Sequence, residues 1–173
     1  MNIFLVGYMA SGKTTIGKAL AEKMNFRFID LDQYIENKEA MSVPEIFRLK
    51  GEIYFRKIET LCLIELIDSN EKSIISLGGG TPCYGNNLEL LLNAENSLTI
   101  YLKASIKELV KRLNKNKLNR PLIAHLDTEE ALTEFIGKHL FERSNYYSQS
   151  KLIVNIDDKN VNQIVEDILL NLF

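Results

Sequence analysis

The sequence has no tryptophan, three prolines and two cysteines. The cysteines, Cys62 and Cys83, are separated by a spacing that resembles no zinc site, and we expect no structural disulfide. Cys62 falls within an apolar pattern of helical spacing and is predicted to be a small core residue, whereas Cys83 is predicted to lie in a loop. Neither a thiolate metal centre nor a disulfide scaffold is therefore expected.

The chain also lacks a strong charge of either sign and any long apolar run. Its formal net charge is −2 and its basic residues are scattered, so it offers no field that would hold a nucleic-acid backbone. No apolar stretch approaches the ~20 residues that span a bilayer, and Met1 leads into Ile3-Phe4-Leu5-Val6 without a basic region or cleavage site. We therefore expect a cytoplasmic protein that binds neither nucleic acid nor membrane.

What is present is typical of one folded domain. Apolar residues make up 46% and charged residues 25% of the 173 residues, and domains usually contain ~100 to 200 residues. Short β-branched or aromatic runs alternate with helical apolar patterns, which predicts a doubly wound α/β fold with a parallel sheet covered on both faces. The predicted strands are residues 3–6, 26–29, 73–77, 98–102 and 152–156.

Two segments, residues 32–60 and 114–127, do not fit simple crossover helices. The second has little apolar periodicity and several basic residues, which favours a mobile flap. Capping boxes predict helix starts at Ser42-Val43-Pro44-Glu45 and Ser105-Ile106-Lys107-Glu108. No repeat or linker divides the chain, so we expect a single domain over residues 1–173.

The strongest functional signal is Gly7-Tyr8-Met9-Ala10-Ser11-Gly12-Lys13-Thr14, which matches G-x-x-x-x-G-K-[ST] between a predicted strand and a helical pattern. Glycines let backbone N–H groups turn toward phosphate oxygens, and the helix N-terminus adds partial positive charge. Lys13 reaches the β- and γ-phosphates, and the Thr14 hydroxyl binds Mg²⁺. We therefore expect this P-loop, residues 7–15, to bind ATP and Mg²⁺. The residues expected at the nucleotide are Ala10, Ser11, Gly12, Lys13, Thr14 and Thr15.

A P-loop does not identify the phosphoryl acceptor, so the ends of the other strands must be considered. The second strand ends in Asp30 and Asp32. From an extended chain, a spacing of two lets both carboxylates face the nucleotide, although a helix N-cap role is open for either. The third strand is followed by Gly78-Gly79-Gly80, which allows a ligand to approach backbone N–H groups; a tight turn is the alternative.

Three arginines also stand out, although any one of them alone would more often be a solvated surface charge. Arg56 lies in Phe55-Arg56-Lys57-Ile58-Glu59, Arg120 precedes Pro121, and Arg143 lies in Glu142-Arg143-Ser144-Asn145-Tyr146-Tyr147. Singly these residues indicate no function.

Taken together, the motifs make the sequence resemble the shikimate kinase family over nearly its whole length. In order, they are Gly7-Tyr8-Met9, Phe28-Ile29-Asp30-Leu31-Asp32, Glu45-Ile46-Phe47, Gly51-Glu52, Phe55-Arg56-Lys57-Ile58-Glu59, Leu77-Gly78-Gly79-Gly80-Thr81-Pro82, Arg120-Pro121-Leu122 and Arg143-Ser144-Asn145-Tyr146-Tyr147. Their order and spacing make the resemblance specific.

The resemblance implies a P-loop three-layer α/β fold whose five parallel strands follow the order 2-3-1-4-5. It implies a substrate-binding insertion at about residues 32–60 and a lid at about residues 114–127. It also implies ATP-dependent phosphorylation of the 3-hydroxyl of shikimate, a step in aromatic amino-acid biosynthesis. We expect a monomer.

Carried onto this sequence, the family pattern places Mg²⁺ near Thr14 and Asp30. It places the hydroxyls of shikimate on Asp32, a carboxylate that can orient or deprotonate the attacking hydroxyl. Lys13 and the lid residue Arg120 then neutralise charge on the transferring phosphoryl group.

The same pattern places the carboxylate of shikimate between Arg56 and Arg143. An arginine presents a rigid fork of donors that matches a carboxylate, so both residue types suit the role. Gly79 and Gly80 line the substrate site, and Arg112 is expected on the adenine side of the nucleotide.

The sequence departs from the family pattern at a few positions. Ala10 and Ala40 each stand where a glycine is common, and Asn119 lies in a lid that is unusually rich in Lys and Asn. Because an alanine is excluded only where φ is positive, we expect φ to be negative at Ala10 and ATP binding to be intact. The lid differences bear on lid kinetics more than on the reaction.

Two other functions are consistent with a P-loop. One is a kinase for another small acceptor, such as a gluconate-like sugar acid or a nucleoside monophosphate. The other is a nucleotide-switched binding protein, although the guanine signature of small GTPases does not appear; the segment that comes nearest to it is Ile156-Asp157-Asp158-Lys159. ADP release that depends on an added acceptor would separate the enzyme from the switch.

Overall fold

The computed structural model describes residues 1–115 and 122–172. Its centre is a five-stranded parallel sheet with the order β2-β3-β1-β4-β5, which confirms the predicted fold class. The strands are β1 (Asn2–Val6), β2 (Arg27–Asp30), β3 (Ser73–Ser76), β4 (Ser97–Lys103) and β5 (Leu152–Asn155). Each begins and ends within one residue of its predicted range, because β-branched and aromatic runs that are buried on both faces mark parallel strands clearly.

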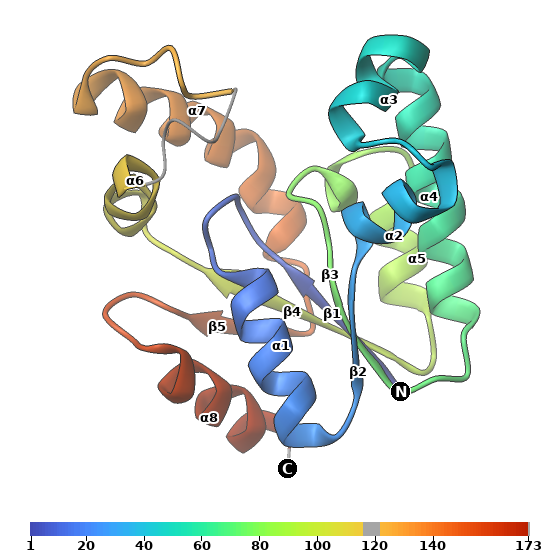
Figure 1. The fold of residues 1–173 in the computed structure, drawn as a ribbon. Coiled ribbons are helices and arrows are strands. Elements are labelled where there is room, and N and C mark those ends of the chain that lie inside the picture. Colours follow the sequence, from blue (N-terminus) through green and yellow to red (C-terminus); the bar gives the residue numbers. More distant parts are fainter. Residues whose placement is uncertain (116–121, 173) are drawn as a thin grey trace.

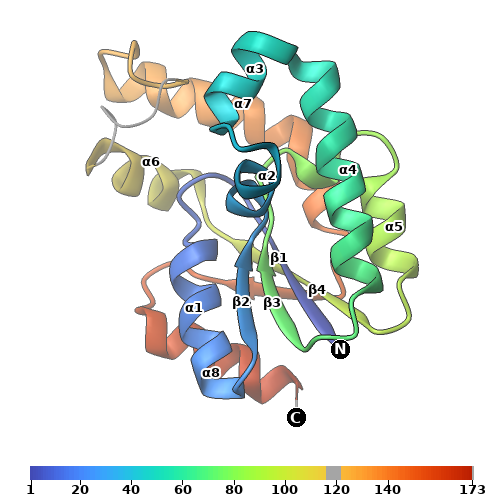
Figure 2. The ribbon, with the colours of Figure 1, turned by 45° about the vertical axis from the view of Figure 1, so that its right-hand side comes forward.

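Helices cover both faces of the sheet (Figures 1 and 2). The helices are α1 (Lys13–Met24), α2 (Leu31–Glu39), α3 (Val43–Lys50), α4 (Glu52–Asp68), η1 (Thr81–Cys83), α5 (Asn87–Asn93), α6 (Ile106–Lys115), α7 (Glu129–Tyr147) and α8 (Val161–Leu172). Helices α1 and α8 pack together on one face, and α4 and α5 pack together on the other. Helix α3 stands on one side of the loop after β1 and the pair α6 and α7 on the other (Figure 1).

Strand register aligns the carboxyl ends of the three strands that matter most for the site. Asp30 at the end of β2 pairs with Ser76 at the end of β3, and Ser76 also pairs with Leu5 in β1. The chain segments that leave these strands, including the P-loop and Gly78, therefore emerge at one edge of the sheet. This edge is where ligands bind in open parallel sheets.

Residues 32–60, predicted as an insertion, contain most of α2, all of α3 and the first half of α4. Asp30 is the N-cap of α2, since its Oδ1 accepts hydrogen bonds from the backbone N–H groups of Asp32 and Gln33. Asp32 therefore lies in the first helical turn. The expectation that Asp30 and Asp32 project from one extended chain was wrong for Asp32, because the N-cap bonds of Asp30 start a helix at Leu31.

The two predicted capping boxes differ in outcome. Ser42 and Glu45 exchange side-chain-to-backbone bonds at the start of α3, as predicted. At α6 only half of the box forms, because Ser105 accepts from Glu108 N while its own N–H donates to Asp157 Oδ1. An aspartate from another loop has taken the place of the glutamate.

The two alanines that replace family glycines both have positive φ. Ala10 has φ 64° and Ala40, the C-cap of α2, has φ 51°. The prediction of negative φ at Ala10 was therefore wrong. The fold holds the P-loop and the α2 terminus in left-handed conformations, and the alanine methyl group costs roughly 1 to 2 kcal/mol at each.

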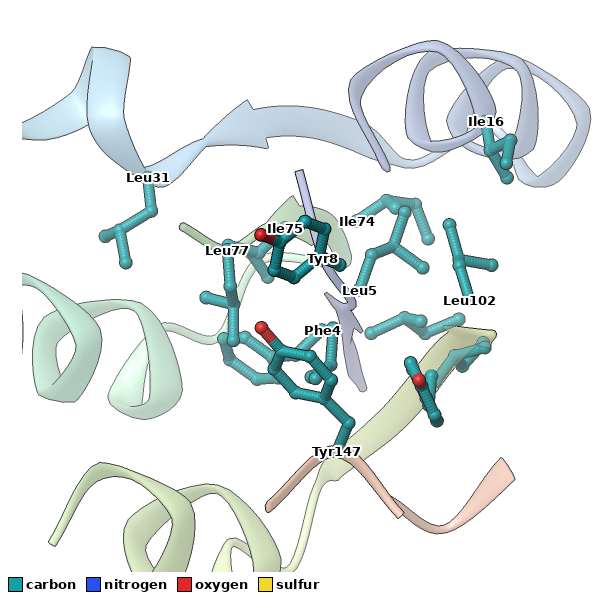
Figure 3. Close-up of a cluster of buried hydrophobic side chains, with 14 of the residues drawn as sticks. Phe4, Leu5, Tyr8, Ile16, Leu31, Ile74, Ile75, Leu77, Leu102 and Tyr147 are labelled. Carbon is teal, nitrogen blue, oxygen red and sulfur yellow. The ribbon is translucent and has the colours of Figure 1, made fainter. Parts of the chain in front are cut away.

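The hydrophobic core continues beyond the strand ends toward the loop edge (Figure 3). Tyr8 and Leu77 are each 2% exposed and Tyr147 is fully buried, although all three follow regular elements or end them. Cys62 is buried in α4 as predicted, whereas Cys83 lies in η1 and not in an irregular loop; both thiols are free. The loop edge is thus anchored by packed side chains.

The predicted lid falls partly outside the described residues. Helix α6 ends at Lys115 and α7 begins at Glu129. Between them, Ile123 is buried in the core while Leu122 is 61% exposed. Arg120 and Asn119 lie outside the described residues, so their assignments stay predictions.

We expect Ala40→Gly to increase the free energy of unfolding by about 0.5 to 1 kcal/mol, and so to raise the thermal unfolding midpoint. Glycine at a helix C-cap with positive φ avoids the steric penalty of the alanine methyl group. The matched control is Ala19→Gly inside α1, where the same change should lower stability by about 1 kcal/mol. Thermal unfolding of the three proteins measures both effects. Destabilisation by both changes would contradict the left-handed geometry at residue 40.

Candidate functional site

The P-loop is shaped by two glycines and closed by its own lysine. A methyl group on Gly7 would lie 2.8 Å from Ser11 Oγ and 3.0 Å from the carbonyl oxygen of Leu102, so only glycine fits. Gly12 has φ 90° and caps α1. Lys13 Nζ donates to the carbonyl oxygens of Gly7 at 2.8 Å and Tyr8 at 3.1 Å, which places the ammonium group across the mouth of the loop.

A cavity of about 490 Å³, which we call the P-loop cavity, opens beside this loop. Its lining includes most of the residues predicted to bind the nucleotide. They are Ala10, Gly12, Lys13, Thr14, Thr15 and Arg112. Arg112 is held at the rim by Glu108 Oε1 at 2.7 Å and the carbonyl oxygen of Ala10 at 3.3 Å.

Ser11 is the exception among the predicted nucleotide residues. Its side chain is fully buried, its backbone N–H donates to the carbonyl oxygen of Tyr8 at 3.1 Å, and it does not line the cavity. In this conformation the Ser11 side chain is buried inside the protein and does not face the cavity. The G-x-x-x-x-G-K-T pattern identifies the loop but does not tell which of its side chains face inward.

Two oxygen groups meet below the P-loop. Thr14 Oγ1 donates to Asp30 Oδ2 at 3.0 Å, while the other oxygen of Asp30 caps α2. Asp32 also lines the P-loop cavity. The described residues contain no group of three His, Cys, Asp or Glu side chains that could hold a metal ion, so a cation here would need other ligands as well.

A second cavity of about 380 Å³, which we call the triglycine cavity, adjoins the first. The two cavities share four lining residues, namely Met9, Asp32, Gly78 and Gly79. Arg56 and Arg143 line the triglycine cavity but not the P-loop cavity. Asp32 therefore stands at the boundary, between the lysine of the P-loop and the two arginines.

The glycine run Gly78–Gly80, which we call the triglycine loop, allows three charged side chains to converge. Methyl groups built on its residues would meet Asp32 Oδ1 at 3.3 Å, an Nη of Arg143 at 3.4 Å and an Nη of Arg56 at 3.2 Å, in the order of the chain. Each glycine thus faces one predicted substrate residue. A side chain at any of the three would take space at the mouth of the cavity.

Arg56 is fixed by a buried acid that the sequence reasoning did not single out. Glu59 is 1% exposed and accepts from Arg56 Nη1 at 2.8 Å and from Thr81 Oγ1 at 2.7 Å. The guanidinium carbon of Arg56 also lies 3.8 Å from the centre of the Tyr84 ring. The i, i+3 spacing of Arg56 and Glu59 was the available signal for this pair.

The carboxyl group of Asp32 has an unusual environment. Burial is the largest cause that raises its pKa, to about 6, and the charges of Asp30 and Glu59 raise it further while Lys13 opposes them. The ionised form of Asp32 is therefore dominant at neutral pH, but burial and the neighbouring acids destabilise it. A carboxylate of this kind is suited to accept a proton or a hydroxyl hydrogen bond.

Comparison with known proteins shows which family of P-loop proteins the chain belongs to. The sequence model of the shikimate kinase family matches residues 9–173. The shikimate kinase of Flavobacterium johnsoniae is 50% identical over 167 residues, which cover 96% of this chain and 96% of that protein. The chain belongs to the shikimate kinase family.

Solved structures of this family have the same fold. The shikimate kinase of Bacteroides thetaiotaomicron has a TM-score of 0.87 and 35% identity and covers 99% of this chain and 98% of that one. The shikimate kinase of Acinetobacter baumannii, solved in complex with shikimate, has a TM-score of 0.83 and 30% identity and covers 99% and 92%. Membership in the shikimate kinase family makes the chain an ATP-dependent kinase. It therefore favours an enzyme over a nucleotide-switched binding protein.

We expect Asp32→Asn to stabilise the nucleotide-free protein in EDTA at pH 8 by about 1 to 3 kcal/mol. The folded pKa of Asp32, about 6, lies above the ordinary aspartate value of 3.8, so the folded state binds more protons between these values and stability falls as pH rises through them. The asparagine removes this loss.

Thermal unfolding at pH 4.5 and pH 8 measures the effect, and the advantage of Asp32→Asn should shrink at the lower pH. Glu22→Gln, at an exposed position in α1, controls for the removal of one negative charge. An advantage of equal size at both pH values would show that Asp32 is not strained by ionisation.

Proposed function

We propose that the P-loop cavity holds ATP and that the triglycine cavity holds shikimate, with the phosphoryl group passing between them beside Asp32. The reaction is phosphorylation of the 3-hydroxyl of shikimate to give shikimate 3-phosphate and ADP, in aromatic amino-acid biosynthesis. The observation that carries the division is the shared wall, Met9, Asp32, Gly78 and Gly79. Two substrates placed on either side of it would have adjacent reacting groups.

On the acceptor side, Asp32 orients the 3-hydroxyl and receives its proton. The hydroxyl oxygen forms a bond to the γ-phosphorus as the bond between that phosphorus and the β–γ bridging oxygen breaks, and ADP leaves. The raised pKa of Asp32, about 6, makes this carboxylate a better proton acceptor than an ordinary aspartate. Gly78, which leaves space 3.3 Å from Asp32 Oδ1, admits the acceptor to it.

On the donor side, Lys13 and the P-loop backbone hold the phosphates. The ammonium group of Lys13 already lies against the carbonyl oxygens of Gly7 and Tyr8, a position from which it faces the cavity. Arg120 is proposed to add a second positive charge from the lid, and Arg112 to contact the adenine side. In phosphoryl transfer the main contribution of a protein is such positioning and charge neutralisation.

The residues at Thr14 and Asp30 fit Mg²⁺. Their side-chain oxygens lie 3.0 Å apart at the foot of the P-loop, and Mg²⁺ prefers oxygen ligands and usually binds to one or two protein groups, phosphate oxygens and water. The small number of protein ligands here agrees with that preference. Bound Mg²⁺ would neutralise phosphate charge and help to orient the γ-phosphoryl group.

The carboxylate of shikimate is proposed to bind between Arg56 and Arg143. Arg56 is paired with Glu59 at 2.8 Å, but within the described part of the chain Arg143 forms no ion pair. Arg143 therefore carries a positive charge that an anionic ligand can neutralise. The apolar groups of Val43, Phe47 and Phe55 line the same cavity and offer a surface for the carbon ring.

We further propose that the chain acts as a monomer in the cytoplasm. Among residues 1–115 and 122–172, no helix is long and apolar enough to cross a membrane.

We expect Arg143→Lys and Arg56→Lys each to raise the KM for shikimate by roughly ten- to a hundredfold, because lysine keeps the charge but loses the donor fork. The KM for ATP should change less than twofold. Steady-state kinetics with shikimate and with its carboxamide analogue measure this directly. The parent should discriminate strongly against the amide and both variants less so; equal use of acid and amide by the parent would overturn the carboxylate assignment.

We expect Asp30→Asn to shift the Mg²⁺ concentration for half-maximal activity upward by roughly tenfold, since a neutral amide is a weaker ligand than a carboxylate. Asparagine caps a helix as well as aspartate does, so the start of α2 should be preserved. Activity titrated with Mg²⁺ at saturating ATP gives the shift, and unfolding curves check the fold. An unchanged midpoint would remove Asp30 from the metal site.

A further inference from the structure

One face of α7 carries three polar side chains at a spacing of four residues. They are His139, Arg143 and Tyr147. Residues four apart on a helix are neighbours on its surface, so Arg143 lies between the other two along this face. The proposed substrate arginine is thus flanked by one possible hydrogen-bonding group on each side.

His139 contacts the P-loop. The hydroxyl of Tyr8 and Nδ1 of His139 are 2.9 Å apart and form a hydrogen bond. Their rings also meet edge to face with centroids 5.5 Å apart, and the ring of Phe135 contacts the same imidazole with centroids 5.4 Å apart. Because Tyr8 is 2% exposed, this contact connects the middle of α7 to a buried residue of the P-loop.

Tyr147 contacts the triglycine loop. Its hydroxyl donates to the carbonyl oxygen of Gly79 at 2.5 Å, and its ring is fully buried against Tyr101. Tyr8 and Tyr147 lie in the same buried cluster at the loop edge (Figure 3). The last turn of α7 is therefore fixed to the loop that faces Arg143.

Arg143 lies within electrostatic reach of all three groups. Burial is the largest influence on these groups, raising the pKa values of Tyr8 and Tyr147 and lowering the pKa of His139. The charge of Arg143 is a smaller influence that acts to lower all three pKa values. Its guanidinium group also stands 3.4 Å from the methyl position of Gly79. The helix thus has one contact with the site on each side of Arg143.

We propose that His139 and Tyr147 are positioning residues that hold Arg143 toward the triglycine cavity, His139 through its hydrogen bond with Tyr8 and Tyr147 through its hydrogen bond to Gly79. This inference rests on the proposed role of Arg143 as a ligand of the shikimate carboxylate. It adds that the P-loop, through Tyr8, helps to place a residue of the acceptor site. Loss of either bond would let the helix face shift and weaken the grip on the carboxylate.

The test compares the KM for shikimate with the KM for ATP in variants of the full chain. His139→Ala, Tyr8→Phe and Tyr147→Phe should each raise the KM for shikimate roughly three- to tenfold, the effect of one neutral hydrogen bond, with less than a twofold change in the KM for ATP. His139→Asn keeps a polar group near the Nδ1 position that can donate or accept, so it should recover most of the loss. Lys138→Ala, which removes an exposed neighbour on the same helix, should leave both values unchanged.

Double variants test the route. Tyr8→Phe combined with His139→Ala should raise the KM for shikimate no more than either change alone, because both remove one bond. His139→Ala added to Arg143→Lys should raise it less than twofold further. Independent, multiplicative effects in both cases would overturn the inference.

The same set separates this inference from the proposed function. If Arg143→Lys leaves the KM for shikimate unchanged, the carboxylate role of Arg143 fails and the inference fails with it. If Arg143→Lys raises that KM while His139→Ala and Tyr147→Phe lower only the unfolding temperature, Arg143 keeps its role and its proposed positioning residues are merely structural.

Discussion

The close approach of three chain segments at the triglycine loop is the constraint on which the rest of the site depends. Side chains from α2, α7 and α4 reach this loop, where Asp32, Arg143 and Arg56 would each lie 3.2 to 3.4 Å from a methyl group on Gly78, Gly79 and Gly80, respectively. The parallel sheet brings the loop to the same edge as the P-loop, through the pairing of β3 with β1. The glycines here leave space beside these side chains and are not required by backbone conformation, since none of the three has positive φ.

Charge is distributed unevenly across that edge. Asp32 and Glu59 are buried near one another, and Glu59 forms an ion pair with Arg56. Lys13 lines the P-loop cavity and Arg143 the triglycine cavity, whereas Asp32 lines both. Such an arrangement is costly without ligands and less so with anionic groups on both sides, which is typical of sites where stability has been exchanged for binding.

Much of the fold could be predicted because its signals are local. The strands are short buried runs, and Ser42 with Glu45 marks the start of α3 within four residues. The prediction that Asp32 projects from an extended chain was wrong. Whether a strand or a helix follows Asp30 depends on hydrogen bonds that the Asp30 side chain accepts. The prediction of negative φ at Ala10 was wrong because it rested on the general preference of alanine, which the surrounding loop overrides.

The candidate site could be assembled in part from motif order. Asp32, Arg56 and Arg143 were predicted together and the structure brings them to one cavity. What sequence reasoning missed were partners distant in the chain, such as Tyr8 with His139 and Tyr147 with Gly79. Tyrosines and a histidine in helical patterns look like ordinary core residues, so only the packing reveals what their polar atoms contact.

The division of the site between chain segments has a consequence for how such enzymes diversify. The groups proposed to face the nucleotide come mainly from one continuous stretch, residues 7–15, whereas the two arginines of the triglycine cavity come from α4 and α7. Substitutions on these helices can alter the acceptor while the inherited nucleotide machinery stays intact. The Tyr8–His139 contact limits that independence. Because it joins α7 to the P-loop, substitutions that shift α7 would also affect the nucleotide side.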